Sequence, residues 1–236
     1  MWVVVGLGNP GEQYAGTRHN VGYLVADRLA SLDPCVRRSS LGLSRVAEAR
    51  VSELQLAIVW PETYMNRSGL ALMELGQRTP FDLSCLVVLH DDVDLPFGTI
   101  RLKLGGGLGG HRGLGSIASE LGSTEFLRVR LGIGRPLAGD LSEHVLGPWD
   151  PAEYEVLGDL LDRACEATMQ LLADGIALAS NRWNVRPRGT PRAPSNDREM
   201  DPSDEQGDER PAKGTISEPR GDADKGQMDG DSGRDP

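Results

Sequence analysis

The chain has 236 residues with 25 Lys or Arg and 35 Asp or Glu, so its formal net charge is −10. This length is enough for one domain with an additional segment, or for two small domains. The acidic balance argues against a protein that coats nucleic acid without specificity, although it is compatible with a local basic face. Three cysteines without paired spacing, Cys35, Cys85 and Cys165, indicate neither a disulfide framework nor a zinc site.

No segment has the composition of a signal peptide or a membrane span. The N-terminus lacks a basic region, and its apolar run is too short for a signal peptide. No stretch approaches the ~20 apolar residues that a membrane-spanning helix needs. We therefore expect a cytoplasmic protein without a membrane partner.

The last fifty residues differ in composition from the rest of the chain. Residues 187–236 contain no aromatic residue, Leu or Val, but 13 acidic and 8 basic side chains. So few apolar groups cannot offset the entropy lost on ordering the chain. We expect residues 1–186 to form one catalytic domain with a net charge of −5, and residues 187–236 to form a disordered, acidic, Pro/Gly-rich tail whose partner is unknown.

Strands and helices are predicted to alternate along the domain. The continuous apolar run over residues 2–5 is typical of a strand covered on both faces, and apolar residues at helical spacing predict a helix over 21–29. After a polar connector over 35–44, alternating residues predict two antiparallel strands over 44–50 and 53–60. The remaining predicted elements are a helix that ends before Thr79, strands over 86–89 and 100–104, a helix over 114–121, a strand over 128–133 and a helix over 154–172. Residues 176–183 are expected to close the ordered part of the chain.

This order of elements predicts the fold class. Strands that alternate with helices form an α/β domain whose helices cover both faces of the sheet. The short turns between some strands require antiparallel pairs as well. We therefore expect a single α/β domain with a mixed, mostly parallel twisted sheet.

The glycines that follow the first strand match a nucleotide-binding motif only in part. Gly6, Gly8 and Gly11 spell G-x-G-x-x-G, the dinucleotide fingerprint. In that motif the third glycine lies in the first helical turn, whereas here a proline precedes it and the helical pattern begins later. Asp27 falls inside a helix rather than at the end of a second strand. We therefore expect no cofactor, and we interpret the glycines as a tight turn that presents Asn9.

Polar side chains follow the ends of several predicted strands. His19 lies in a loop after the first strand, and Asp91 lies at the end of the strand over 86–89. Because such strand ends share one crevice in an open α/β sheet, we expect His19 and Asp91 to meet there as a general base and its orienting carboxylate. Asn9 and Asn66 also lie on strand-end loops. Since few Ser or Cys residues accompany these motifs, we expect water to be the attacking group.

A metal centre is the alternative that these residues leave open. None of the candidates follows a dedicated ligand spacing such as H-E-x-x-H or an EF-hand loop. We therefore expect no metal, and we interpret His90 and His144 as structural residues. The candidate ligands are His19, His90, Asp91, Asp92, Asp94 and His111.

Basic side chains are concentrated around a second Gly-rich loop. Residues 98–135 contain six basic and only two acidic residues. On neighbouring strands beside such a loop, they would form a patch that holds the phosphates of RNA. These basic residues are Arg101, Lys103, Arg112, Arg128, Arg130 and Arg135.

Several stretches resemble bacterial-type peptidyl-tRNA hydrolases: GLGNPGEQYAGTRHNVG, PETYMNRSG, HDDVDLPFG, and KLGGGLGGHRGLGSI followed by LGSTEFLRVRLGIGRP. They occur in order between residue 3 and about residue 184. The resemblance implies a monomeric domain that binds tRNA and hydrolyses the ester between a peptide and the terminal ribose, which recycles tRNA in translation. The alternative is a non-catalytic RNA-binding relative with the same fold.

The resemblance also implies roles for individual residues. His19 matches the general base and Asp91 the carboxylate that stabilises its basic form. Asn9 matches the residue that distinguishes N-blocked from free aminoacyl groups, and Asn66 is a donor for the oxyanion. The residues implied to contact the peptide or the tRNA are Tyr14, Tyr64, Met65, Asn66, Lys103, His111, Arg112 and Arg130.

Arg112 departs from the family pattern, which usually has Gly-His-Asn-Gly where this chain has Gly-His-Arg-Gly. Arg cannot accept a hydrogen bond, so a substrate contact through the Asn carbonyl is lost. We expect Arg112 either to hold a phosphate or to lower activity. The connector over 35–44 also looks shorter than in the family, and the acidic tail is not part of the family pattern.

Overall fold

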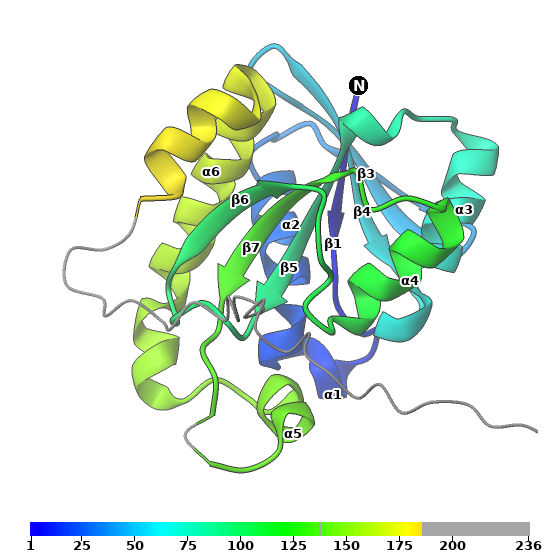
Figure 1. The fold of residues 1–236 in the computed structure, drawn as a ribbon. Helices are drawn as coiled ribbons and strands as arrows, with labels where there is room; N and C mark the ends of the chain where they lie inside the picture. The colour runs from blue at the N-terminus through cyan, green and yellow to red at the C-terminus, as the bar shows by residue number, and fades with distance from the viewer. Residues whose placement is uncertain (137, 186–236) are drawn as a thin grey trace, which may run out of the picture. The chain divides into compact units, whose positions relative to one another are not determined.

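The computed structural model describes residues 1–136 and 138–185 (Figure 1). The predicted disordered tail over 187–236 lies outside the described residues. The strands are β1 (Trp2–Gly6), β2 (Arg37–Leu41), β3 (Ser44–Val51), β4 (Leu54–Pro61), β5 (Leu86–Asp92), β6 (Ile100–Leu104) and β7 (Leu127–Gly132). The α-helices are α1 (Glu12–Ala15), α2 (Val21–Ala30), α3 (Ser68–Arg78), α4 (Arg112–Leu121), α5 (Leu141–Leu146) and α6 (Pro151–Trp183). The short 3-10 helices are η1 (Arg18–Asn20), η2 (Met65–Arg67) and η3 (Leu83–Cys85).

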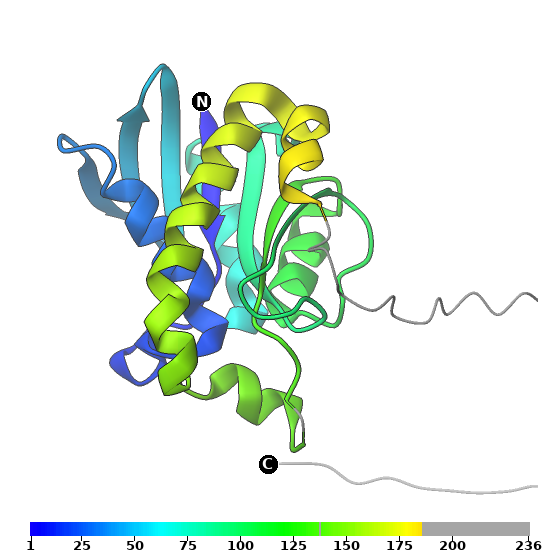
Figure 2. The ribbon, with the colours of Figure 1, turned by 90° about the vertical axis from the view of Figure 1, so that its left-hand side faces the viewer.

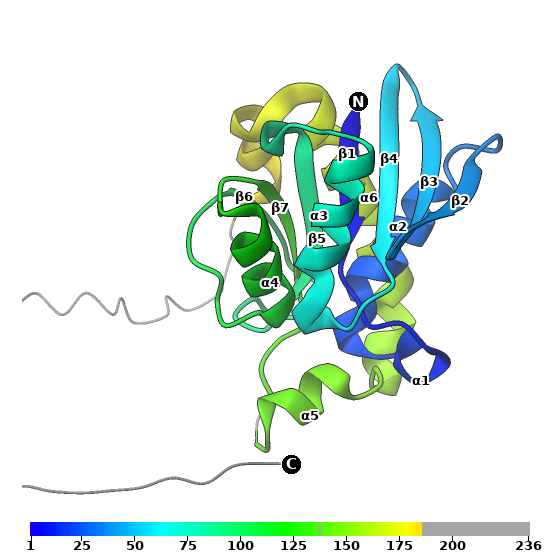
Figure 3. The same ribbon diagram turned by 90° about the vertical axis from the view of Figure 1, so that its right-hand side faces the viewer.

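The described strands form one mixed sheet in the order β2-β3-β4-β1-β5-β7-β6. The central strands β4, β1, β5 and β7 are parallel to one another, whereas β2, β3 and β6 pair antiparallel at the two sides. Helices α2 and α6 lie on one face of the sheet (Figure 2), and α3 and α4 cover the other (Figure 3). The predicted α/β domain with a mixed, largely parallel sheet is therefore confirmed.

The central strands are apolar on both faces because each face has its own core. Val4 of β1 packs in the cluster that includes α2 and α6, whereas Val3 and Val5 pack in the cluster that includes α3 and α4. Parallel strands covered by helices on both sides require such continuous apolar runs. This packing explains why residues 2–5 carry no alternating polar positions.

Glycines let α2 approach the sheet closely. A Cβ atom on Gly6 would overlap the carbonyl oxygen of Gly22 in α2, and one on Gly22 would overlap the carbonyl oxygen of Leu89 in β5. A Cβ atom on Gly8 would press into the ring of Tyr23. The first two glycines of the G-x-G-x-x-G stretch therefore serve helix packing, which fixes η1, just before α2, at the edge of the sheet.

The structure differs from the predicted elements chiefly at β2 and α5. The predicted connector over 35–44 contains β2, an exposed edge strand that pairs with β3. Its sequence is polar because an edge strand buries few side chains, so the apolar pattern that predicts a strand is missing. Helix α5 was not predicted and is capped by the Asp140 carboxylate, which accepts from the backbone N–H groups of Ser142 and Glu143. The helical pattern over 154–172 and the segment over 176–183 both lie in α6, where Gly175 has a non-helical φ of 77° and separates two helical parts. No helix among the described residues is both long and apolar enough to cross a membrane.

Candidate active site

A cavity of about 620 Å³ opens beyond the carboxyl ends of the central strands. Because β1, β4 and β5 are parallel, the loops that follow them meet at the same edge of the sheet. Every residue predicted from the sequence as a site residue lines this cavity, although their roles remain predictions. These residues are Asn9, Tyr14, His19, Tyr64, Met65, Asn66, Asp91, Lys103, His111, Arg112 and Arg130.

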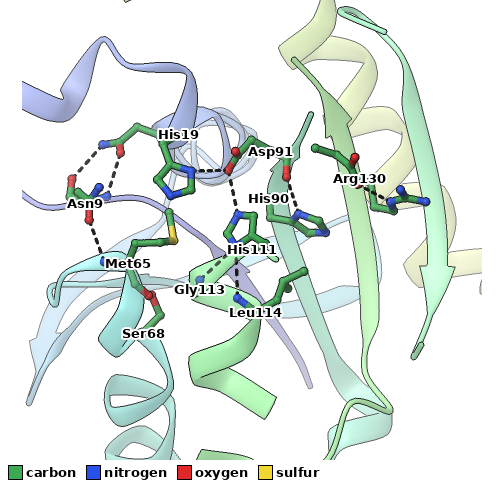
Figure 4. A network of polar contacts seen from close by, with 12 residues as sticks. Asn9, His19, Met65, Ser68, His90, Asp91, His111, Gly113, Leu114 and Arg130 are labelled. Carbon is green, nitrogen blue, oxygen red and sulfur yellow. Dashed lines mark hydrogen bonds and ion pairs between the residues drawn. The ribbon is translucent and has the colours of Figure 1, made fainter. Parts of the chain in front are cut away.

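His19 and Asp91 form a buried pair in the cavity (Figure 4). His19, in η1, is 9% exposed, and Asp91, near the end of β5, is 3% exposed. The Nδ1 atom of His19 lies 2.9 Å from Oδ1 of Asp91. A neutral His19 that donates its Nδ1–H to this carboxylate keeps the lone pair of Nε2, which has no hydrogen-bond partner among the described residues. The geometry is that of an imidazole oriented to take up a proton.

A second histidine holds the same carboxylate oxygen. The Nε2 atom of His111 lies 3.0 Å from Oδ1 of Asp91, and its Nδ1 accepts from the backbone N–H groups of Gly113 and Leu114 at the start of α4. Burial acts to raise the pKa of Asp91, but His111 and His19 together hold that pKa well below its usual range. Asp91 is therefore ionised at neutral pH, although it is buried.

His90 is neutral and points away from this pair. Its Nδ1–H donates to the backbone carbonyl oxygen of Asp91 at 2.7 Å. Burial, followed by repulsion from His111, lowers the pKa of His90 from its ordinary 6.5 to about 3. His144, on α5, contacts the carbonyl oxygen of Gly134 through Nε2 at 3.0 Å. Both histidines contact backbone carbonyl oxygens, and neither has a carboxylate partner among the described residues.

Asn9 is buried in the cavity wall and held by contacts from two other segments. Its backbone N–H donates to Asn20 Oδ1 at 2.8 Å, and the Asn20 amide donates back to its carbonyl oxygen at 2.9 Å. The side-chain oxygen of Asn9 accepts from the backbone N–H of Met65 at 2.8 Å. The amide NH₂ of Asn9 is therefore the group left for a ligand. These contacts of Asn20 were not predicted, although Asn20 directly follows His19.

Arg18 is a second residue whose contacts were not predicted from the sequence. It is buried beside His19, and its Nη2 lies 2.6 Å from Oε2 of Glu153 and 3.1 Å from Oδ2 of Asp150. Its Nη1 donates to the carbonyl oxygen of His144. Arg18 thus fastens η1 to α5 and to the N-terminal end of α6. The sequence held no signal for this contact, because Glu153 is 135 residues away.

The basic patch predicted over residues 98–135 is narrower in the structure. Arg130 bonds Asp92 at 2.7 Å and Arg135 bonds Asp94 at 2.6 Å. Arg128 is buried and donates to backbone carbonyl groups of the Gly-rich loop and of Thr124, and Arg101 donates to the carbonyl oxygen of Trp183. Asp92 and Asp94 precede residue 98 in the sequence, so they were not counted with the basic residues over 98–135, but the fold places them next to Arg130 and Arg135. Among the described residues, only Lys103 and Arg112 of the six line the cavity without a hydrogen bond or ion pair.

The rest of the cavity wall is largely apolar. Tyr14 and Tyr64 meet edge to face with ring centroids 6.4 Å apart. Helix α5 also contributes apolar side chains to the cavity wall. No sequence pattern predicted this contribution. Such walls suit an apolar ligand group more than a free ion. The apolar residues that line the cavity are Val93, Leu108, Leu114, Leu141, Val145 and Leu146.

The donor set fits a metal poorly. The ligand atoms of His19, Asp91 and His111 lie within 4.8 Å of one another. However, Nδ1 of His111 accepts two backbone hydrogen bonds, so its neutral ring carries the proton on Nε2 and offers no lone pair there. A metal-bound histidine normally donates, rather than accepts, through its other nitrogen. Asp92 and Asp94, two further candidate ligands, form ion pairs with Arg130 and Arg135.

Comparison with known proteins gives one consistent match. The family model described as peptidyl-tRNA hydrolase matches residues 3–191. The peptidyl-tRNA hydrolase of Pelobacter propionicus is 45% identical over 188 residues, which is 79% of this chain and 96% of that protein. The enzyme of Carboxydothermus hydrogenoformans is 44% identical over 184 residues, covering 78% of this chain and 98% of that protein.

A solved structure extends the match to the fold. The crystal structure of peptidyl-tRNA hydrolase from Acinetobacter baumannii superposes with a TM-score of 0.72 at 32% identity, covering 78% of this chain and 95% of that chain. The resemblance seen in the sequence is confirmed, and the matched region spans nearly the whole length of these relatives. The chain belongs to the peptidyl-tRNA hydrolase family.

Proposed function

We propose that this chain hydrolyses the ester between a peptide and the terminal ribose of tRNA, acting as a cytoplasmic monomer that returns tRNA to translation. The observation that carries the proposal is the 2.9 Å contact between His19 Nδ1 and Asp91 Oδ1, which leaves Nε2 of His19 free within the cavity of a hydrolase family member. No cofactor or metal enters the proposed reaction.

The reaction begins with a water molecule held at Nε2 of His19. As the water oxygen bonds to the ester carbonyl carbon, Nε2 takes its proton, and the charged Asp91 stabilises the imidazolium that forms. The carbonyl oxygen becomes an oxyanion, which the side-chain amide of Asn66 meets as a donor. Collapse of the intermediate breaks the bond to the ribose oxygen, which takes the proton back from His19. The products are a free peptide carboxyl group and tRNA.

Asn9 is placed to select peptidyl over aminoacyl substrates. Its side-chain oxygen is occupied by the backbone N–H of Met65, so its NH₂ group is the part that faces a ligand. This donor suits the carbonyl oxygen of an N-blocked amino acid. A free α-amino group lacks that carbonyl and carries a positive charge, so it would leave the donor without a partner.

The tRNA end would lie along the polar and aromatic rim. Tyr14 and Tyr64 offer ring faces and edges for a base, a sequence-tolerant interaction. Lys103 is free to meet a phosphate, whereas Arg130 would have to share its charge with Asp92. The non-catalytic alternative has less support, because the base, its carboxylate and both asparagines are all present in one cavity.

Hydrolysis of an N-acetylaminoacyl-tRNA tests the proposal. His19→Asn places an amide where Nδ1 was, so it keeps a donor to Asp91 but has no group that can take a proton. We expect its rate to fall by at least ~100-fold, the usual contribution of a general base, while its melting temperature stays near that of the wild type. His144→Asn is the matched control on a histidine without a carboxylate partner, and it should retain turnover. A wild-type rate no higher than that of His19→Ala would remove the enzyme hypothesis and leave an RNA-binding protein.

A further inference from the structure

His111 occupies both of its ring nitrogens within the protein. Nδ1 lies 3.1 Å from the backbone nitrogen of Gly113 and 3.3 Å from that of Leu114, and Nε2 lies 3.0 Å from Oδ1 of Asp91 (Figure 4). The side chain is 8% exposed. Its polar atoms are thus used by the protein itself, although the residue lines the cavity.

These partners determine where the proton of His111 resides. A backbone N–H can only donate, so Nδ1 must present its lone pair to α4. The proton of the neutral ring is therefore on Nε2, where it is donated to Asp91. The same carboxylate oxygen accepts from Nδ1 of His19 at 2.9 Å. Oδ1 of Asp91 therefore accepts two hydrogen bonds, one from the candidate base His19 and one from His111, whose ring is held by the start of α4.

We propose that His111 is a positioning residue, which ties the N-terminus of α4 to Asp91 and thereby sets the direction and strength of the Asp91–His19 hydrogen bond. The proposal rests on the hydrolase function proposed above and gives that site a further residue. In this arrangement α4 fixes the ring of His111, the ring fixes the carboxylate, and the carboxylate fixes His19. His111 does not itself contact the reacting atoms.

The donor from His111 also moderates the charge that His19 meets. A carboxylate that is already neutralised in part by one donor attracts a second cation less strongly. Removing the His111 donor would leave more negative charge facing His19, so protonated His19 would be favoured. The acidic limb of the kcat/KM profile should then move to higher pH. The other charged or titratable side chains that line the cavity are Tyr14, Tyr64, His90, Asp92, Asp94, Lys103, Arg112, Arg128, Arg130 and Asp140.

Two amide substitutions separate the two contacts of His111. In His111→Asn the side-chain oxygen can take the place of Nδ1 and keep the cap of α4, since Asn is among the best N-cap residues, but the donor to Asp91 is lost. In His111→Gln the amide can reach the place of Nε2 and keep that donor, but the cap is lost. Each variant thus serves as the matched control of the other.

The expected results are opposite for the two variants. His111→Asn should keep the wild-type melting temperature, lower kcat by about tenfold with KM within about twofold, and shift the acidic limb upward by about half a pH unit. His111→Gln should lower the melting temperature and leave the acidic limb in place. If both variants move stability and leave the pH profile of kcat/KM unchanged, His111 only caps α4 and the proposal is overturned.

Nuclear magnetic resonance tests the proposal without any assay of activity. Long-range ¹H–¹⁵N spectra of the full chain with labelled histidine distinguish the two neutral tautomers of each ring. We expect His111 as the Nε2–H tautomer at neutral pH, and His19 and His90 as Nδ1–H tautomers. An Nδ1–H tautomer for His111 would contradict the proposal directly. If the wild type fails to cleave N-acetylaminoacyl-tRNA while these tautomers are found, the proposed function fails and the positioning contact stands.

Discussion

Replacing Asp91 by Asn would measure the charge on which His19 depends. The carboxylate oxygen accepts from both His19 and His111, so an Asn side chain would direct its oxygen to the same two donors and preserve the geometry. The substitution would therefore remove the negative charge and little else. Any loss of rate would report how far that charge stabilises the imidazolium formed in the reaction.

The size of the effect follows from the distance between the pair. With Nδ1 2.9 Å from Oδ1, the charge centres lie ~4 Å apart, and at an effective dielectric constant of ~20 their attraction is about 4 kcal/mol. The difference between a charged and a neutral hydrogen bond sets a lower bound of about 1.5 kcal/mol. These limits correspond to a loss in kcat of roughly 10-fold to 10³-fold.

Single-turnover cleavage of N-acetylaminoacyl-tRNA at saturating enzyme isolates this step from substrate binding. Asp92→Asn is the matched control, because Asp92 bonds Arg130 at 2.7 Å and has no hydrogen bond or ion pair with a histidine among the described residues. We expect Asp92→Asn to change KM and its salt dependence more than kcat. A single-turnover rate for Asp91→Asn within threefold of the wild type, at an unchanged melting temperature, would refute the idea that Asp91 acts through its charge.

Three further predictions concern binding, pH and packing. Arg112→Asn should raise KM for tRNA several-fold, because it removes a positive charge from the cavity. The slope of log KM against log salt concentration should also decrease by about one, as expected for the loss of one phosphate contact. An unchanged slope would show that Arg112 does not contact the tRNA. The folded pKa of His90 is about 3 against 6.5 when unfolded, so its contribution to stability is complete above pH 6.5 and is lost as pH falls toward 3, by ~5 kcal/mol at most. Urea unfolding at pH 7 and pH 4.5 should therefore show a smaller acid loss in His90→Asn than in the wild type, and equal losses would refute this account. Gly22→Ala should destabilise the fold by about 1–3 kcal/mol, because its Cβ atom would overlap backbone atoms. Gly158→Ala should stabilise the fold slightly, because the space around Gly158 in α6 is open. Similar melting temperatures for the two variants would contradict the packing argument.

The sequence by itself determined the fold class and the position of the site. Continuous apolar runs mark strands buried on both faces, and parallel strands bring their carboxyl ends to one edge. That rule was enough to predict that His19 and Asp91 meet, although 72 residues separate them. The same rule brings Asn9 and Asn66 to the same cavity. Each inference needs only local patterns and one general property of α/β sheets.

The tertiary structure decided the partners of the polar side chains. The basic residues over 98–135 looked free in the sequence. The pairing of β5 with β7 puts His90 opposite Arg130 and brings Asp92, two residues further along β5, within reach of Arg130, while Asp94 reaches Arg135. The proton position on His111 depends on where α4 begins, and the anchoring of Arg18 depends on Glu153, far along the chain. Such pairings follow from register, burial and side-chain direction over long separations, which local composition does not encode. The sequence therefore predicted where the site lies. Only the tertiary structure determined which nitrogen atoms donate, which oxygen atoms accept, and which basic side chains have no acidic partner among the described residues.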